Sequence, residues 1–261
     1  MDSLIKYTEQ NPNDKTASEL LRLKDHFDKI LESTGGKFRE LHGSFLFDGK
    51  KYNYLISELE RQKLLYNIAK QNSSCLEIGT NMGHSSLIML LANHKMKITT
   101  IDIEKQLAEP ATNYLKSFFK EAEINFLNFS SPEILNKIDE KFDFVLIDGD
   151  HSYFPVFREF ASSLRLSNNK DLFKVIFDDL DMAPKLKKSI NILKIEKFMD
   201  AKCDGGYSSY YEINTKKNLE NFLRFFLFFS FNYFFNFFGY VKYYLKKIKI
   251  LRKIKKTLLT N

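Results

Sequence analysis

Short apolar runs alternate with amphipathic segments from residue 74 onward, and this alternation constrains the fold more than any other feature of the chain. Such runs are typical of strands that are buried on both faces of a parallel sheet, and the segments between them have the pattern of covering helices. The expected parallel strands are 74–79, 97–102, 124–129, 142–148 and 172–178. The expected helices are 85–92, 110–122, 132–138 and 154–164.

Two later segments, 198–202 and 208–214, are expected to form a terminal antiparallel hairpin joined near Asp204-Gly205-Gly206. Together with the five parallel strands they predict an α/β fold: a Rossmann-like, doubly wound sheet of seven mostly parallel strands. Ligands of such sheets bind at the carboxyl ends of the strands. The residues at those ends are therefore the first candidates for a functional site.

The segment before this alternation, residues 1–54, is predicted to be an N-terminal helical cap. Thr16 to Glu19 fits a capping box, and the apolar spacing that follows is helical until Gly35-Gly36. A second box, Ser57 to Glu60, is expected to open a helix that runs through Ala69. Met1 to Asn13 is polar and has no apolar run, so we expect no secretory signal.

Composition is that of a folded chain, with 44% hydrophobic and 28% charged residues. Its two cysteines, Cys75 and Cys203, lie far apart and are expected to be reduced intracellular thiols. The net charge of +7 comes from residues 216–261, which hold eleven Lys or Arg and one acid, Glu220. The remainder is slightly acidic, so we expect no nucleic-acid partner.

Acidic residues lie at or near the carboxyl end of almost every expected parallel strand: Glu77, Asp102, Asp148, Asp178 and Asp179. The first strand continues through Gly79, which permits a tight turn, into a helix whose N-terminus offers free N–H groups. The GxGxxG spacing of a dinucleotide site is absent. An acid just before the glycine would repel a pyrophosphate but could receive an ammonium group, which favours a zwitterionic ligand.

These residues resemble the class I S-adenosylmethionine-dependent methyltransferases. The ExGxxxG segment from Glu77 to Gly83 looks like their first motif, and Asp102 looks like the acid that holds both ribose hydroxyls. The resemblance implies a methyltransferase domain over residues 55–215, with Ser131 near the adenine. It implies that the cofactor, S-adenosyl-L-methionine, is bound by Glu77, Gly79, Thr80, Gly83, Ser85, Asp102, Ser131 and Asp148.

The stretches FDFVLIDGDHSY (142–153) and FKVIFDDLD (173–181) resemble the branch of metal-dependent O-methyltransferases that includes catechol-type and sugar enzymes. The resemblance implies that Asp148, Asp178 and Asp179 bind Mg²⁺ or Mn²⁺, which prefer carboxylate oxygens. A metal-independent methyltransferase of a small molecule or lipid, with these aspartates merely hydrogen-bonded, is the alternative.

Asp150 and His151 are the candidate catalytic bases, since the sugar-modifying relatives take a base from this turn. Either one could accept a hydroxyl proton, and either could instead be an ordinary turn residue. The catechol-type relatives use a lysine at about this place, and this sequence has none there. That difference favours a hydroxyl of a sugar or glycan precursor as acceptor. A non-catalytic, membrane-tethered adaptor with a degenerate methyltransferase fold is a further alternative.

The C-terminal segment, residues 216–261, is predicted to be a membrane-associating tail. It has ten Phe between residues 222 and 238 and no charge from Phe225 to Val241. Beyond that, apolar residues share one helical face and lysines the other, which is typical of a helix lying on an anionic membrane surface. The expected location is cytoplasmic and peripheral at the inner membrane face. A membrane span and a packing or homo-oligomer arm are the other interpretations.

Overall fold

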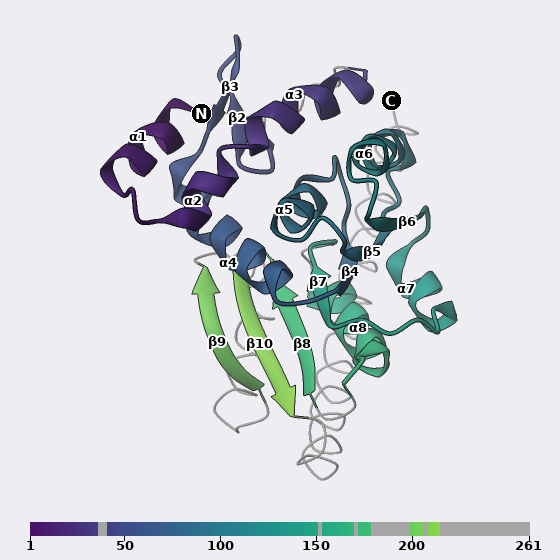
Figure 1. The fold of residues 1–261 in the computed structure, drawn as a ribbon. Coiled ribbons are helices and arrows are strands. Elements are labelled where there is room, and N and C mark those ends of the chain that lie inside the picture. Colours follow the sequence, from purple (N-terminus) through teal and green to yellow (C-terminus); the bar gives the residue numbers. More distant parts are fainter. Residues whose placement is uncertain (36–40, 151–152, 170–171, 179–198, 206–207, 215–261) are drawn as a thin grey trace, which may run out of the picture. The chain divides into compact units, whose positions relative to one another are not determined.

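The computed structural model describes residues 1–35, 41–150, 153–169, 172–178, 199–205 and 208–214 (Figure 1). Met1–Lys216 forms one compact unit. Three predicted features, namely His151, Asp179 and the tail over 216–261, lie outside the described residues. Within the described ranges, no helix is both long enough and apolar enough to cross a membrane.

A central sheet carries the acidic residues identified in the sequence. Its strands are β4 (Ser74–Ile78), β5 (Lys97–Ile101), β6 (Glu123–Leu127), β7 (Phe144–Ile147), β8 (Leu172–Phe177), β9 (Met199–Gly205) and β10 (Ser208–Asn214). Their order across the sheet is β6-β5-β4-β7-β8-β10-β9. Strands β4 to β8 pair in parallel, and β10 is antiparallel to both β8 and β9. The expected α/β, Rossmann-like fold with a mostly parallel sheet is confirmed.

The register of the sheet brings the candidate site residues to one edge. Ile78, the last residue of β4, pairs with Ile101 of β5 and with Ile147 of β7. Ile147 in turn pairs with Phe177 of β8. All residues of β4 and β7 are buried, and apart from Ser74 and Glu77 of β4 they are all apolar, as expected for strands covered on both faces. The polar residues that follow the four strands therefore meet at the carboxyl edge.

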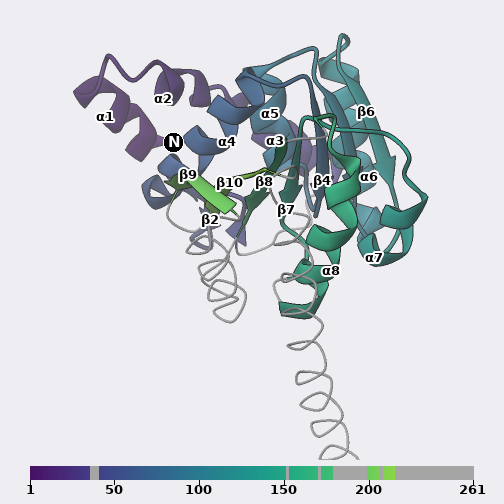
Figure 2. The ribbon, with the colours of Figure 1, turned by 90° about the horizontal axis from the view of Figure 1, so that it is seen from below.

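Helices cover the sheet in two groups (Figures 1 and 2). Helix α4 (Leu59–Lys70) packs against α5 (His84–Ala92), and α7 (Ser131–Ile134) packs against α8 (Tyr153–Ser163). In both views α1 (Asp2–Gln10) and α2 (Lys15–Leu20) lie beside α4, away from α7 and α8.

Helix α6 (Lys105–Phe118) begins five residues before the expected start at Pro110, so that prediction was wrong. Proline is common at the first position of a helix, where its missing N–H costs nothing, but Pro110 lies inside this one. Here the backbone N–H of Ala108 donates to the carbonyl of Glu104 (3.1 Å), so the helix is already formed when Pro110 is reached. Burial of Leu107 and Ala108 stabilises this earlier start.

The N-terminal segment contains more structure than the sequence patterns indicated. The single helix expected from Thr16 is two helices, α2 and α3 (Leu23–Ser33), and the N-cap is Asp14, whose carboxylate accepts from the N–H of Ala17 at 3.0 Å. The break between them lets α2 pack on α4 while α3 packs on α6. At the second expected box no side chain caps the helix, and a 3₁₀ turn (Ile56–Glu58) leads into α4 instead.

The link between α3 and α4 forms a small antiparallel sheet of β1 (Leu41–His42), β2 (Phe45–Phe47) and β3 (Tyr52–Tyr54). The rings of Phe27 and Phe45 stack with their centroids 4.0 Å apart. Both side chains belong to the same hydrophobic core as Cys75 and Ile98 of the central sheet. The N-terminal residues thus share one core with the sheet that carries the site.

Candidate active site

A cavity of about 640 Å³ lies at the carboxyl edge of the sheet. It is lined by the residues that follow β4, β5, β7 and β8, and also by Leu41–Ser44 and by one side of α4. The predicted site residues in its wall are Gly79, Thr80, Ser85, Asp102, Ser131, Asp148, Asp150 and Asp178. The fold therefore collects most of the predicted site around a single cavity.

The turn after β4 depends on Gly79. Its φ is +100°, and a Cβ at this position would lie 2.0 Å from the carbonyl oxygen of Asp148. Its N–H donates to the carbonyl of Ile101 at 2.9 Å, which joins the ends of β4 and β5. Gly83, by contrast, lies outside the cavity lining: it is the N-cap of α5, and its missing side chain leaves room for Leu115 of α6.

Glu77 lies beneath this turn and is fully buried. One carboxylate oxygen accepts from Thr100 Oγ1 (2.5 Å) and Ser86 Oγ (2.7 Å), while Oε1 has no hydrogen-bond partner among the described residues. Removal from water raises the pKa of Glu77 to about 7, although its two hydrogen bonds oppose the shift. Glu77 is not in the cavity lining, so it supports the turn from behind.

Asp102 joins two loops at the cavity wall. Its Oδ2 accepts from the backbone N–H of Asn81 at 2.6 Å, and its Oδ1 accepts from the N–H of Glu104 at 2.7 Å. An ionised carboxylate has about four acceptor positions, so two further hydrogen bonds are available to a ligand. Asp102 is therefore both a clamp between two loops and a candidate binding group.

At another side of the cavity, the hydroxyl of Ser131 donates to Glu159 of α8. The Glu159 side chain is buried, and its Oε2 has no hydrogen-bond partner in the described part of the chain. Burial raises the pKa of Glu159 to about 7, against the effect of the Ser131 hydrogen bond. The sequence interpretation missed Glu159, although an acid on a helix face shared with the buried Val156 and Phe160 was an available signal.

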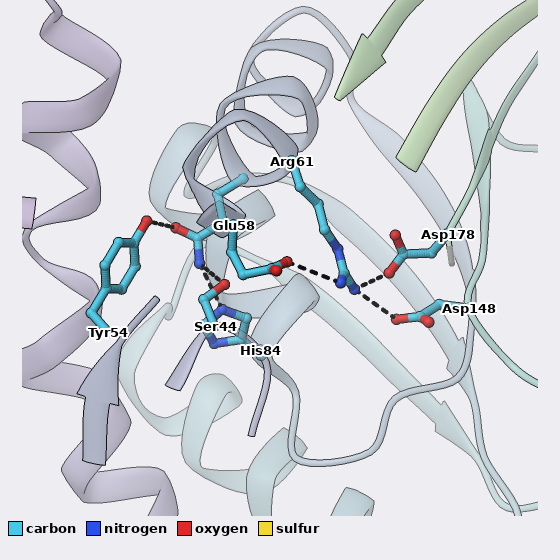
Figure 3. A network of polar contacts seen from close by, with 8 residues as sticks. Ser44, Tyr54, Glu58, Arg61, His84, Asp148 and Asp178 are labelled. Carbon is cyan, nitrogen blue, oxygen red and sulfur yellow. Dashed lines mark hydrogen bonds and ion pairs between the residues drawn. The ribbon is translucent and has the colours of Figure 1, made fainter. Parts of the chain in front are cut away.

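The acidic end of the cavity contains an arginine that the sequence interpretation did not assign (Figure 3). Arg61 of α4 forms an ion pair with Asp178, and its Nη2 lies 3.9 Å from Asp148 Oδ2. On its other side, Nη1 lies 3.4 Å from Glu58 Oε2. Asp150 is exposed and lines the same cavity. No group of three His, Cys, Asp or Glu in the described ranges is placed to hold a metal ion.

A polar network connects α4 to the N-terminal segment (Figure 3). The Tyr54 hydroxyl donates to Gln62 Oε1 (2.7 Å), and the Gln62 amide nitrogen contacts Ser44 Oγ and lies 3.0 Å from His84 Nε2. Burial, with nearby positive charge from His42 and Arg61, lowers the pKa of His84, so its ring is neutral at neutral pH. These residues could not be assigned from the sequence because their contacts span separate segments of the chain.

Comparisons with known proteins agree with this architecture. Residues 76–180 match the family model described as "Methyltransferase domain". The chain is 15% identical to the SAH-bound Podospora anserina methyltransferase PaMTH1, with a TM-score of 0.52 over 73% of this chain and 87% of that one. It is 16% identical to cofactor-bound Rv0187 from MTB, with a TM-score of 0.53 over 74% of this chain and 91% of that one. A search of curated protein sequences found no match. Residues 76–180 of the chain are thus similar to methyltransferase domains, and both structures share the fold of this chain.

Proposed function

We propose that the chain is an S-adenosylmethionine-dependent O-methyltransferase that acts on a hydroxyl of a sugar or glycan precursor. The observation that carries the proposal is that Gly79, Asp102 and Asp150 line one cavity. One continuous surface thus carries a turn for the methionine part of the cofactor, an acid for its ribose and a candidate base for the acceptor. The family match over residues 76–180 supports the reaction class.

The cofactor is proposed to bind along the β4, β5 and α7 part of the cavity wall. Asp102 accepts from the ribose hydroxyls with the positions that its two loop contacts leave open. Ser131 and Glu159 face the adenine, where the buried Oε2 of Glu159 needs a donor. The turn at Gly79 and Thr80 takes the methionine part, and the buried Glu77 lies behind this turn.

The acceptor is proposed to enter at the acidic end, beside Asp148 and Asp150. The cofactor supplies an electrophilic methyl group on a sulfonium. Asp150 or His151 takes the proton of the acceptor hydroxyl, so that the oxygen can form its bond to the methyl carbon while the carbon–sulfur bond breaks. The cavity wall aligns the two reactants, which is a large part of catalysis in a two-substrate reaction. The absence of a lysine in the 148–151 turn supports an alcohol acceptor over a catechol.

The predicted Mg²⁺ or Mn²⁺ does not fit the described residues in this arrangement. Of the three predicted ligands, Asp179 is outside the described ranges, and Asp148 and Asp178 both face the guanidinium of Arg61. A divalent ion between these carboxylates would lie against a fixed positive charge. No step of the proposed reaction is therefore assigned to a metal, which favours the metal-independent alternative for the same site.

Two measurements test this function. Titration calorimetry should detect S-adenosylmethionine binding to the full chain, and Asp102→Ala should weaken it strongly, because the ribose hydroxyls lose their acceptor. Transfer of labelled methyl from the cofactor should be found with sugars, nucleotide sugars or lipid-linked sugars and not with catechol. Asp150→Asn and His151→Ala identify the base. The variant that loses methyl transfer but still binds the cofactor has lost it. Equal binding by wild type and Asp102→Ala would refute the proposal.

We also propose that residues 216–261 attach the protein to an anionic membrane surface, which would place a lipid-linked or surface-glycan precursor within reach. The support is compositional: an uncharged, Phe-rich stretch followed by apolar and lysine faces at helical spacing. A homo-oligomer arm is the competing interpretation, and lipid flotation distinguishes the two.

A further inference from the structure

Asp148 and Asp178 are held close together by the sheet. They follow the neighbouring parallel strands β7 and β8, whose end residues Ile147 and Phe177 are paired. Their side chains are only 19% and 4% exposed. Two ionised carboxylates in such a position repel one another, and solvent screens the repulsion weakly, so a positive group nearby stabilises the pair.

In the described part of the chain, Arg61 places a positive group against both of them. Figure 3 shows its side chain extending from α4 to the two aspartates, with Glu58 on its other side. One guanidinium nitrogen, Nη2, forms ion pairs with both aspartates, and the other, Nη1, forms an ion pair with Glu58. The arginine side chain is 24% exposed and forms part of the cavity wall. A planar guanidinium with five donors suits this arrangement of several carboxylates around one cation.

We propose that Arg61 takes the place of a divalent metal ion at the acceptor end: the chain's own guanidinium is the cation that holds Asp148 and Asp178. The naming of this end as the acceptor end rests on the proposed function. Arg61 is a positioning residue, since it contacts the two carboxylates and Glu58 and acts through them. It follows that methyl transfer does not need a divalent ion.

It also follows that Arg61 and a metal ion exclude one another. An arginine in a protein remains charged at all ordinary pH values, so Arg61 cannot lose a proton to avoid repulsion with a bound metal ion. A divalent ion would need the same carboxylate oxygens that the guanidinium contacts, and the two positive charges would lie a few ångströms apart. Removal of the guanidinium should therefore create an affinity for metal that the wild-type chain lacks.

Titration of the full chain with Mn²⁺ tests this exclusion without any substrate. Wild type should bind Mn²⁺ at millimolar concentration or more weakly, and Arg61→Met, which keeps side-chain length without charge, should bind about tenfold more tightly or better. Arg61→Lys, which restores a cation, should return to the weak binding of wild type. Arg22→Met is the matched control, because Arg22 forms an exposed pair with Glu19 away from the cavity, and it should leave Mn²⁺ binding unchanged.

Micromolar Mn²⁺ binding by wild type would overturn the inference, and this measurement is available even if Arg61→Met does not fold. A failure of folded Arg61→Met to gain affinity would overturn it too. Methyl transfer by wild type should persist undiminished in excess chelator, whereas loss of transfer that Mg²⁺ restores would contradict a metal-free site. Because the Mn²⁺ titration involves no cofactor, failure of the proposed function would appear separately, as absent S-adenosylmethionine binding.

Discussion

The backbone of Gly79 approaches the carbonyl oxygen of Asp148 so closely that a Cβ at residue 79 would lie 2.0 Å from that oxygen. The contact joins the turn after β4 to the end of β7, which are the two parts of the cavity wall proposed to hold the cofactor and the acceptor. The φ of Gly79 is +100°, a conformation that side-chain-bearing residues rarely adopt. Two separate features thus require glycine at this position: the positive φ and the close approach of the Asp148 carbonyl oxygen.

We expect Gly79→Ala to lower the free energy of unfolding by about 3 kcal/mol or more, since it combines backbone strain with a steric clash. It should also abolish cofactor binding. Gly49→Ala is the matched control: Gly49 has a φ of +91° with no atom within 4 Å of its missing Cβ, so it tests conformational strain alone. Its expected cost is about 1 kcal/mol. Denaturant unfolding measures both, and equal costs would contradict the role of the Asp148 contact.

Glu77 predicts a pH dependence of stability. Its pKa in the folded protein is about 7, against an ordinary value of 4.5. Below pH 4.5 the group is protonated in both the folded and the unfolded chain. As the pH rises toward 7 the unfolded chain ionises first, so the folded state loses stability, by about 3 kcal/mol in total for a shift of this size.

Glu77→Gln removes this titration. The free energy of unfolding of the variant minus that of wild type should therefore rise by about 3 kcal/mol between pH 4.5 and pH 8. Urea unfolding at a series of pH values measures the difference. Glu133→Gln, which replaces an exposed acid on α7, is the matched control for the loss of one carboxylate. If the difference in free energy of unfolding between Glu77→Gln and wild type does not change with pH, the buried carboxylate does not titrate as inferred.

The position of Glu159 leads to a prediction about how the adenine of the cofactor is recognised. If its buried Oε2 accepts from the 6-amino group of adenine, the full chain should prefer S-adenosylhomocysteine over the analogue that lacks this amino group by about tenfold, since an unmade hydrogen bond to a buried group costs about 1–3 kcal/mol. Glu159→Leu should weaken binding and remove the preference. Asp102→Asn should weaken both ligands equally, because the ribose is the same. Calorimetry decides, and a preference that survives in Glu159→Leu would contradict the assignment.

The tail predicts a salt-sensitive association with lipid. The full chain should float with vesicles that contain anionic lipid, and less so with neutral vesicles or at high salt. A chain that ends at Asn214 should not float. Replacement of Lys246, Lys249, Lys253 and Lys256 by Gln should weaken association, since each basic residue near such a surface contributes about 1 kcal/mol. Flotation of the shortened chain would locate membrane binding elsewhere, and a change of oligomeric state without flotation would favour the oligomer arm.

The parallel strands could be predicted because their signal is local. Strands β4 and β7 are buried throughout: β7 is continuously apolar, β4 is apolar except for Ser74 and Glu77, and both are bounded by polar turns. Helix starts were harder, since Asp14 rather than Thr16 caps α2 and α6 begins before Pro110. Several residues near each start satisfy the same capping rules, and packing against α4 or the sheet selects among them.

The site was predicted where it depends on strand ends and missed where it depends on contacts between distant segments. Asp102, Asp148 and Asp178 could be placed at one edge because parallel strands end together. Arg61 could not be placed, since it meets Asp178 across 117 positions of the chain. Gln62 and His84 meet by packing of α4 on α5, for which the sequence has no periodic signal.

The sequence by itself determined the α/β class, the acidic carboxyl edge of the sheet and the need for glycine at residue 79, because hydrophobic periodicity and backbone conformation are local properties. Only the tertiary structure decided that Glu77 lies behind the cavity wall, that Glu159 lies in it, and that a guanidinium faces Asp148 and Asp178. The physical reason is that charge balance in a buried site depends on which side chains meet in space. Here the compensating cation comes from a helix that precedes the entire sheet in the chain.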